Sequence, residues 1–134
     1  INELPDFDFV NVVHPRATVG RNVQLAAGVV ILANAVVNSG AKVGPHGVVN
    51  TAAVVEHDCV MGAFSTVAPN AALAGSVRVG ERAYVGIGTC VIQNLSIGAD
   101  TLVGAGSVVV HDLPDGVVAF GNPCRVVRQH TAKK

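Results

Sequence analysis

An aliphatic side chain recurs at every sixth position of this chain, and the register never slips between residues 13 and 109. A period of six fits neither the period of about 3.6 of a helix nor the simple alternation of a β-hairpin. It predicts very short strands joined by tight corners, with one inward aliphatic side chain per strand and successive coils about 4.8 Å apart. The repeated positions are Val13, Val19, Leu25, Ile31, Val37, Val43, Val49, Val55, Met61, Val67, Leu73, Val79, Val85, Val91, Ile97, Val103 and Val109.

The composition narrows the possible functions. Half of the residues are hydrophobic but only 4% are aromatic, so the core is built from small branched side chains. Lys plus Arg and Asp plus Glu number nine each, which gives no basic excess for binding nucleic acid. The longest apolar runs, such as residues 26–33, fall far short of the roughly 20 residues that a membrane-spanning helix needs. We therefore expect one domain with no nucleic-acid partner and no membrane insertion.

Three cysteines, Cys59, Cys90 and Cys124, form an odd number without CxxC spacing. This pattern favours a reducing compartment, so we expect a cytoplasmic protein. Cys59 falls at a hexad position whose side chain points inward, and we interpret it as core packing rather than as a nucleophile. The histidines show neither HxH nor HxxxH spacing, so we predict no metal site.

Three polar residues stand in succession at 56–58, where other hexads carry small residues. Because Val55 points inward in this register, His57 and Asp58 are expected at a corner, on the outside of the coil. A neutral imidazole there can take a proton from an attacking amine or hydroxyl, and a carboxylate beside it can support the imidazolium. The alternative is a surface histidine with a solvated aspartate, and adjacent residues at a corner need not touch.

Residues 50–65, 103–109 and 121–123 resemble the signature of the hexapeptide-repeat acyltransferases, in particular the bacterial sugar acetyltransferases of the PglD, NeuD and PerB type. The resemblance implies an all-β fold, a left-handed parallel β-helix with three hexads per coil and a short C-terminal tail. The left-handed sense of the β-helix comes from the resemblance alone, since parallel crossovers are generally right-handed. Residues 18 apart then stack, which places His57 between Ser39 and Gly75.

We divide the chain into a leading segment (1–12), a β-helix acyltransferase domain (13–110), and a C-terminal turn with a basic tail (111–134). The tail carries Arg125, Arg128, Lys133 and Lys134, either as a solvated end or as a contact for the phosphates of CoA. In the enzymes that the chain resembles, a Rossmann-type domain precedes the β-helix and holds much of the nucleotide sugar. We expect that domain to have been removed or to be absent here, so the acceptor cannot be read from the sequence.

The resemblance also implies an activity: transfer of acetyl from acetyl-CoA to the amino group of a UDP- or GDP-linked 4-amino sugar. His57 would be the catalytic base and Asp58 the residue that raises its basicity. The protein would be a homotrimer with active sites between subunits. The positions that match the cofactor groove are Thr66, Gly86, Ile87, Gly104 and Ala105.

One departure and two alternatives accompany this hypothesis. Where many relatives have Phe-Ser-His, this chain has Phe64-Ser65-Thr66, so a hydrogen bond to the cofactor must come from a hydroxyl or be lost. O-acetylation of a sugar or of serine would use the same fold and base. A non-catalytic trimeric β-helix scaffold would share the repeat without the chemistry.

Overall fold

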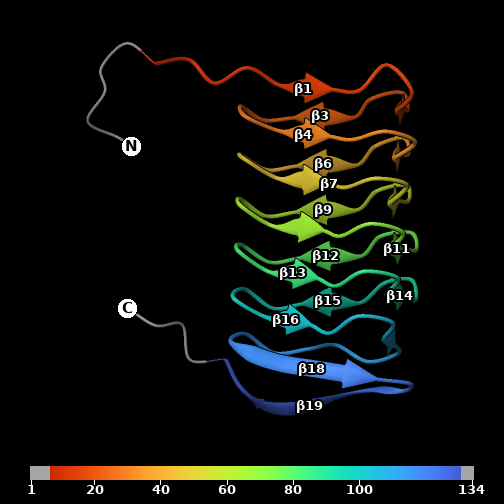
Figure 1. Cartoon of the computed structure of the whole chain (residues 1–134), viewed down its shortest axis with the longest axis vertical. Coiled ribbons are helices and arrows are strands. Elements are labelled where there is room, and N and C mark those ends of the chain that lie inside the picture. The colour runs from red at the N-terminus through yellow and green to blue at the C-terminus, as the bar shows by residue number, and fades with distance from the viewer. Residues whose placement is uncertain (1–6, 131–134) are drawn as a thin grey trace.

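The computed structural model describes residues 7–130 as a three-sided solenoid of short parallel strands, with β1 at one end and β19 at the other (Figure 1). Face A carries β1 (Val12–Val13), β4 (Val30–Ile31), β7 (Val48–Val49), β10 (Thr66–Val67), β13 (Tyr84–Val85), β16 (Leu102–Val103), β18 (Val117–Gly121) and β19 (Cys124–Gln129). Face B carries β2 (Thr18–Val19), β5 (Val36–Val37), β8 (Val54–Val55), β11 (Ala72–Leu73), β14 (Cys90–Val91) and β17 (Val108–Val109). Face C carries β3 (Gln24–Leu25), β6 (Lys42–Val43), β9 (Val60–Met61), β12 (Arg78–Val79) and β15 (Ser96–Ile97).

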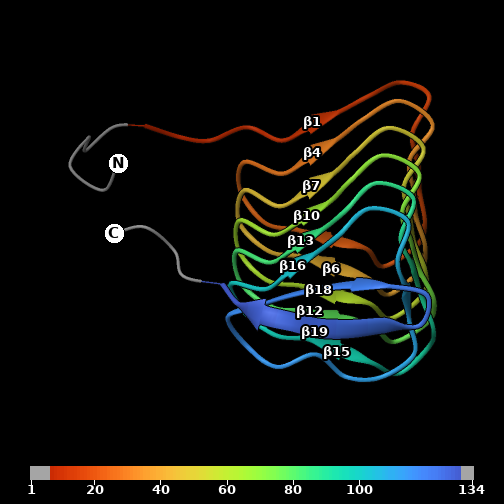
Figure 2. The same ribbon diagram turned by 60° about the horizontal axis from the view of Figure 1, so that its bottom comes forward.

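Successive coils are in a constant register. Thr66 pairs with Val48 in the preceding coil and with Tyr84 in the following one, an offset of 18 residues in each direction. Figure 2 shows the coils stacked along one axis, with a corner at each change of face. The predicted all-β fold with three hexads per coil is confirmed.

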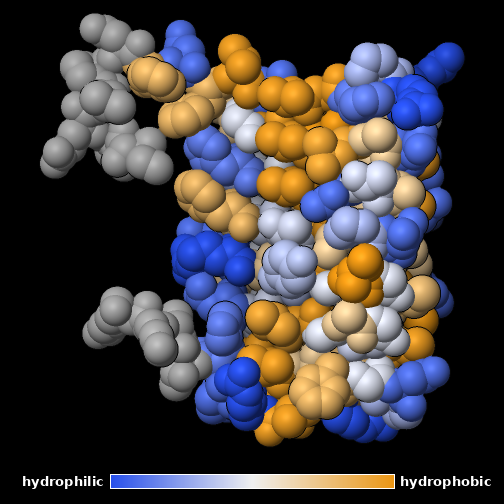
Figure 3. Space-filling model, viewed as in Figure 1, coloured by the Kyte–Doolittle hydropathy of each residue, from blue (hydrophilic) through white to orange (hydrophobic). Residues whose placement is uncertain are grey.

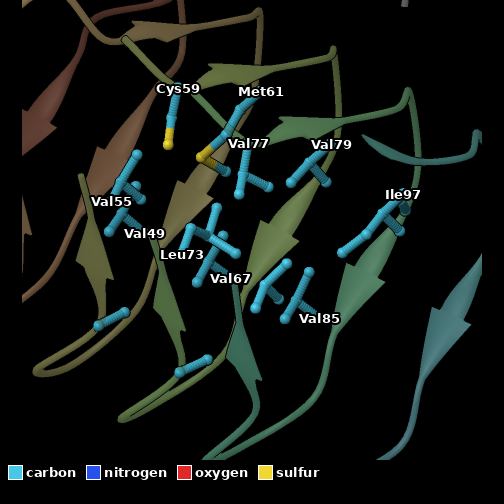
Figure 4. Close-up of a cluster of buried hydrophobic side chains, with 14 of the residues drawn as sticks. Val49, Val55, Cys59, Met61, Val67, Leu73, Val77, Val79, Val85 and Ile97 are labelled. Atoms are coloured by element: carbon cyan, nitrogen blue, oxygen red, sulfur yellow. The ribbon is translucent and has the colours of Figure 1, made fainter. Parts of the chain in front are cut away.

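The core is a column of aliphatic side chains inside the coils (Figure 4). The second residue of each strand points inward, so Val55, Leu73 and Val67 are fully buried. Cys59 is buried as well, and its thiol donates to the Ala74 carbonyl at 3.2 Å. Burial raises the pKa of that thiol, so it stays protonated and apolar. The interpretation of Cys59 as core packing is confirmed.

The corners depend on residues that tolerate a left-handed backbone. Asp58 has a φ of 60°, and Asp and Asn reach this region at low cost because their short polar side chains bond locally. The same conformation recurs in the other coils at Asn22, Asn34, Asn70, Asn94 and Asp100. The aspartate of the His-Asp pair therefore also suits its place in the turn.

The C-terminal end of the solenoid is closed by a hairpin. β18 pairs in parallel with β16, and β19 then turns back antiparallel against β18. The parallel ladder thus continues beyond residue 110, although the domain boundary placed there remains a prediction. Lys133 and Lys134 of the basic tail, and residues 1–6 of the leading segment, lie outside the described residues.

The three faces differ in polarity. The outward strand residues of face A are Val12, Val30, Val48, Thr66, Tyr84 and Leu102, and those of face B are Thr18, Val36, Val54, Ala72, Cys90 and Val108. Those of face C are Gln24, Lys42, Val60, Arg78 and Ser96. Figure 3 shows hydrophobic surface along face A, interrupted at mid-height. Faces A and B are thus mainly apolar and face C is polar. Across residues 7–130 we find no helix that could span a membrane.

Candidate active site

His57 and Asp58 lie at the corner between β8 and β9, where face B turns into face C. Their side chains meet: His57 Nδ1 is 2.9 Å from Asp58 Oδ2. Both side chains are exposed, at 59% and 65%. Because an ionised carboxylate can only accept hydrogen bonds, Nδ1 of a neutral imidazole must donate, which leaves the lone pair on Nε2. The free nitrogen is therefore available to take a proton.

The backbone of this corner is fixed by the coils on both sides. The Asp58 N–H donates to the Ser39 carbonyl at 3.1 Å, and the His57 carbonyl accepts from the Ser76 N–H at 2.9 Å. The Glu56 carboxylate adds a hydrogen bond of 3.2 Å from the His57 N–H. The His-Asp pair thus sits on a rigid element, which keeps a catalytic group in one geometry.

Gly75 leaves room for the imidazole one coil further along. A Cβ built on Gly75 would lie 2.5 Å from His57 Nε2, so no other residue fits without moving the ring. The φ of Gly75 lies outside the left-handed region, so the backbone does not itself require glycine there. The Gly75 N–H finds no acceptor within residues 7–130. A base and an unpaired N–H at one corner are the groups that acyl transfer requires.

The five positions expected to contact the cofactor lie elsewhere on the same chain. Thr66 is on face A, and the other four are at the corners that lead from face A to face B. Ile87 is 51% exposed there. A Cβ on Gly86 would lie 2.5 Å from the Val103 carbonyl oxygen, so packing between coils alone explains that glycine. The structure groups these positions along one edge and separates them from the His-Asp corner.

A shallow apolar groove on face B borders the His-Asp corner. Its floor and walls are formed by Val54, Ala72, Leu73, Ala74, Cys90, Val91 and Ile92, with Glu56 and Gln93 as polar members. The sequence analysis did not identify this groove. The signal was present as two outward alanines, Ala72 and Ala74, where the neighbouring coils carry Val54 with Glu56 and Cys90 with Ile92.

Three of the four other histidines have structural partners. His14 accepts a hydrogen bond from the Arg16 N–H, and His130 lies 2.7 Å from the Asp100 carbonyl oxygen. His46 stacks on Phe64 with ring centroids 4.9 Å apart. Among the residues that the structure describes, no group of three His, Cys, Asp or Glu side chains could hold a metal ion.

No family model matches the chain. GDP-perosamine N-acetyltransferase of Escherichia coli O157:H7 is 30% identical over 125 residues, which are 90% of this chain and 57% of that protein. PerB from Caulobacter crescentus, crystallised with CoA and GDP-perosamine, matches with a TM-score of 0.89 and 49% identity over 90% of this chain and 58% of PerB. The chain is a hexapeptide-repeat left-handed β-helix domain. The predicted left-handed sense of the β-helix is thereby confirmed.

A third relative is an acetyltransferase domain. The acetyltransferase domain of PglB from Neisseria gonorrhoeae, in complex with acetyl coenzyme A, matches this β-helix domain with a TM-score of 0.89 and 40% identity. The match covers 90% of this chain and 59% of that one. The β-helix domain thus spans less than two thirds of each of these three relatives.

Proposed function

We propose that this chain is the acetyl-transfer domain of an enzyme that moves acetyl from acetyl-CoA to the amino group of a nucleotide-linked sugar. The observation that carries the proposal is the His57–Asp58 contact, with Nε2 facing the space above Gly75. The relatives with the same fold support the substrates, since PerB was crystallised with CoA and GDP-perosamine and PglB with acetyl coenzyme A.

The chemistry is general-base acyl transfer. The sugar amine attacks the thioester carbonyl carbon while His57 Nε2 takes a proton from the nitrogen, and the new C–N bond gives a tetrahedral oxyanion. The Gly75 N–H, which has no acceptor within residues 7–130, donates to that oxyanion. When the C–S bond breaks, the imidazolium returns its proton to the thiolate of CoA. Asp58 stabilises the imidazolium while it carries the extra proton.

The enzyme is a homotrimer with its sites between subunits. Faces A and B are the two mainly apolar faces and meet along one edge, so each can cover a neighbour. A ring closed by one repeated heterologous contact needs such a pair of faces on every subunit. Pairing face A of one subunit with face B of the next brings the Thr66 face of one chain toward the His57 corner of another.

Acetyl-CoA serves as a co-substrate, and the Thr66 hydroxyl takes the cofactor hydrogen bond that a histidine provides in many similar sequences. We place the enzyme in the cytoplasm. Cys59, Cys90 and Cys124 are all free in the structure, which suits a reducing compartment.

The test is release of CoA thiol from acetyl-CoA in the presence of GDP- and UDP-linked amino sugars, beginning with GDP-perosamine. We expect turnover with one of these acceptors, and a loss of about 10²- to 10⁴-fold in kcat for His57→Ala, because the base is removed. The KM for acetyl-CoA should change little, and circular dichroism should show an intact fold.

A folded His57→Ala variant with wild-type turnover would remove His57 from the mechanism. Turnover with neutral sugars or serine in place of amino sugars would assign O-acetyl transfer. If the trimer binds no acetyl-CoA at all, the scaffold alternative is the correct one.

A further inference from the structure

Glu56 lies beside the base and takes no part in the proton transfers of the proposed reaction. It precedes His57 at the corner between β8 and β9, and its Oε2 accepts a hydrogen bond of 3.2 Å from the His57 N–H. Within residues 7–130, no Lys or Arg side chain forms an ion pair with Glu56, and Oε1 accepts no hydrogen bond. The backbone contact thus holds a carboxylate whose charge has no partner in this part of the chain.

The carboxylate is on the reacting side of the corner. The Glu56 N–H donates to the Leu73 carbonyl at 3.0 Å, and the strand register stacks Glu56 one coil before Ala74. Ala74 precedes Gly75, the residue that His57 Nε2 faces. Glu56 and Ala74 also line the same hollow beside the corner. The carboxylate is therefore next to the place where an acceptor gives up its proton.

Packing between subunits does not explain a carboxylate at this position. An apolar neighbouring face would leave Oε1 buried without a partner, which costs free energy. The charge also opposes the oxyanion that forms at Gly75, because like charges repel. With a hydroxyl acceptor, Glu56 would therefore only oppose the reaction. With a cationic acceptor the sign is reversed, because an ammonium group donates a charge-assisted hydrogen bond to the carboxylate.

We propose that Glu56 binds the ammonium form of the acceptor and so selects an amine over a hydroxyl. The inference rests on the proposed function. A primary amine close to electron-withdrawing groups, like an α-amino group, has a pKa of about 8 and is mostly protonated at neutral pH. The bound ammonium loses one proton to solvent, and the neutral amine then attacks while His57 takes a second proton and the C–N bond forms. The C–S bond breaks, and the imidazolium returns its proton to the thiolate of CoA.

The test is calorimetry with two ligands, GDP-perosamine and the same sugar nucleotide with a hydroxyl in place of its amino group. Glu56→Gln keeps an oxygen that can accept from the His57 N–H but removes the charge. At pH 7 the variant should bind GDP-perosamine about fivefold more weakly and the hydroxyl ligand as the wild type does. At about pH 10 the amine is neutral, so the difference between variant and wild type should disappear. A purely structural role would change the affinity for both ligands alike.

Glu81→Gln is the matched control, because Glu81 is an exposed glutamate at another corner, where it contacts Arg82. It should leave both affinities as in the wild type. Equal binding of the two ligands by the wild type at pH 7, or a preference for the amine that survives Glu56→Gln, overturns the inference even where acetyl transfer is found. A wild-type preference that persists at about pH 10 overturns it without any variant. A preference that Glu56→Gln abolishes, without thiol release from acetyl-CoA, upholds the ammonium site and counts against the proposed function.

Discussion

At the scale of single residues, the His57–Asp58 contact depends on the backbone conformation of the corner. The sequence shows that both residues lie outside the coil, but it does not show whether they touch. Asp58 adopts a φ of 60°, and in this conformation its carboxylate lies 2.9 Å from Nδ1 of the preceding histidine. His111 and Asp112 form the same dipeptide, yet there the carboxylate accepts from the Ser96 N–H instead.

The role of the carboxylate can be tested with Asp58→Asn. Asparagine adopts the same turn conformation in four other coils, so the fold should be unaffected. Asparagine can still accept a hydrogen bond from Nδ1 but lacks the negative charge that stabilises the imidazolium, so kcat should fall about 10- to 100-fold while the KM for acetyl-CoA stays unchanged. Steady-state kinetics measures both. Asp112→Asn keeps its acceptor oxygen and is the control; an equal loss of activity in both variants would show that the contact with His57 is irrelevant.

Gly75 shows what the register of 18 adds at this scale. Small residues are common in the corners of the repeat, so a glycine at one corner appears ordinary by itself. Its spatial reason becomes visible only when the coils are stacked, because the imidazole that needs the space is 18 residues earlier in the chain.

At the scale of strands and coils, the repeat alone predicted most of the structure. The inward aliphatic positions and the register of 18 follow from the spacing, because a slip of one residue would turn polar groups into the core. The C-terminal hairpin did not follow. The repeat ends near residue 110, and an extended segment at 117–120 without a period gives no indication of which strand it pairs with.

The inward column provides the main stability, and Leu73→Ala tests this. Leu73 is fully buried between the neighbouring strands of face B, so its truncation leaves a cavity. We expect the free energy of unfolding to fall by about 2–5 kcal/mol in a denaturant titration. Val126→Ala, on the exposed side of β19, should cost less than about 1 kcal/mol. Similar costs at the two positions would contradict the assignment of the core.

Consecutive coils are also joined by an ion pair on the edge between faces C and A. The guanidinium of Arg82 contacts Asp100 with two hydrogen bonds of 2.6 and 2.8 Å, and it contacts Glu81 as well. Arg82 holds the pKa of Asp100 below its ordinary value of 3.8, chiefly through these hydrogen bonds. The pair therefore stabilises the fold above that pH and loses its effect as the carboxylate is protonated in more acidic solution.

Arg82→Met should accordingly destabilise the protein near neutral pH and leave it close to the wild type in strong acid. Denaturant titrations at a series of pH values from 7 to below the ordinary aspartate pKa of 3.8 would measure the difference. Because the pair is exposed, the effect should shrink in high salt. If the difference in unfolding free energy between the two proteins grows on acidification, this account is wrong.

At the scale of the whole molecule, one chain contains both parts of the proposed site, the base and the cofactor positions, but the two parts lie apart. The base is at the corner between faces B and C, and the cofactor positions Thr66, Ile87 and Ala105 lie on face A and its corner with face B. The repeat predicts which residues stack, but no pattern within one chain states which faces of two copies meet. That part of the hypothesis came from the family resemblance, and the polarity of the faces now supports it.

The most direct measurement mixes two inactive variants. His57→Ala removes the base, and Ala105→Trp fills the cofactor corner at an exposed position. If each site takes His57 from one subunit and Ala105 from its neighbour, unfolding and refolding the two variants together in equal amounts should restore about one quarter of the wild-type thiol release. Each variant refolded alone should stay inactive. A mixture that also stays inactive, although mixed trimers form, would show that the site lies within one chain and would contradict the central claim.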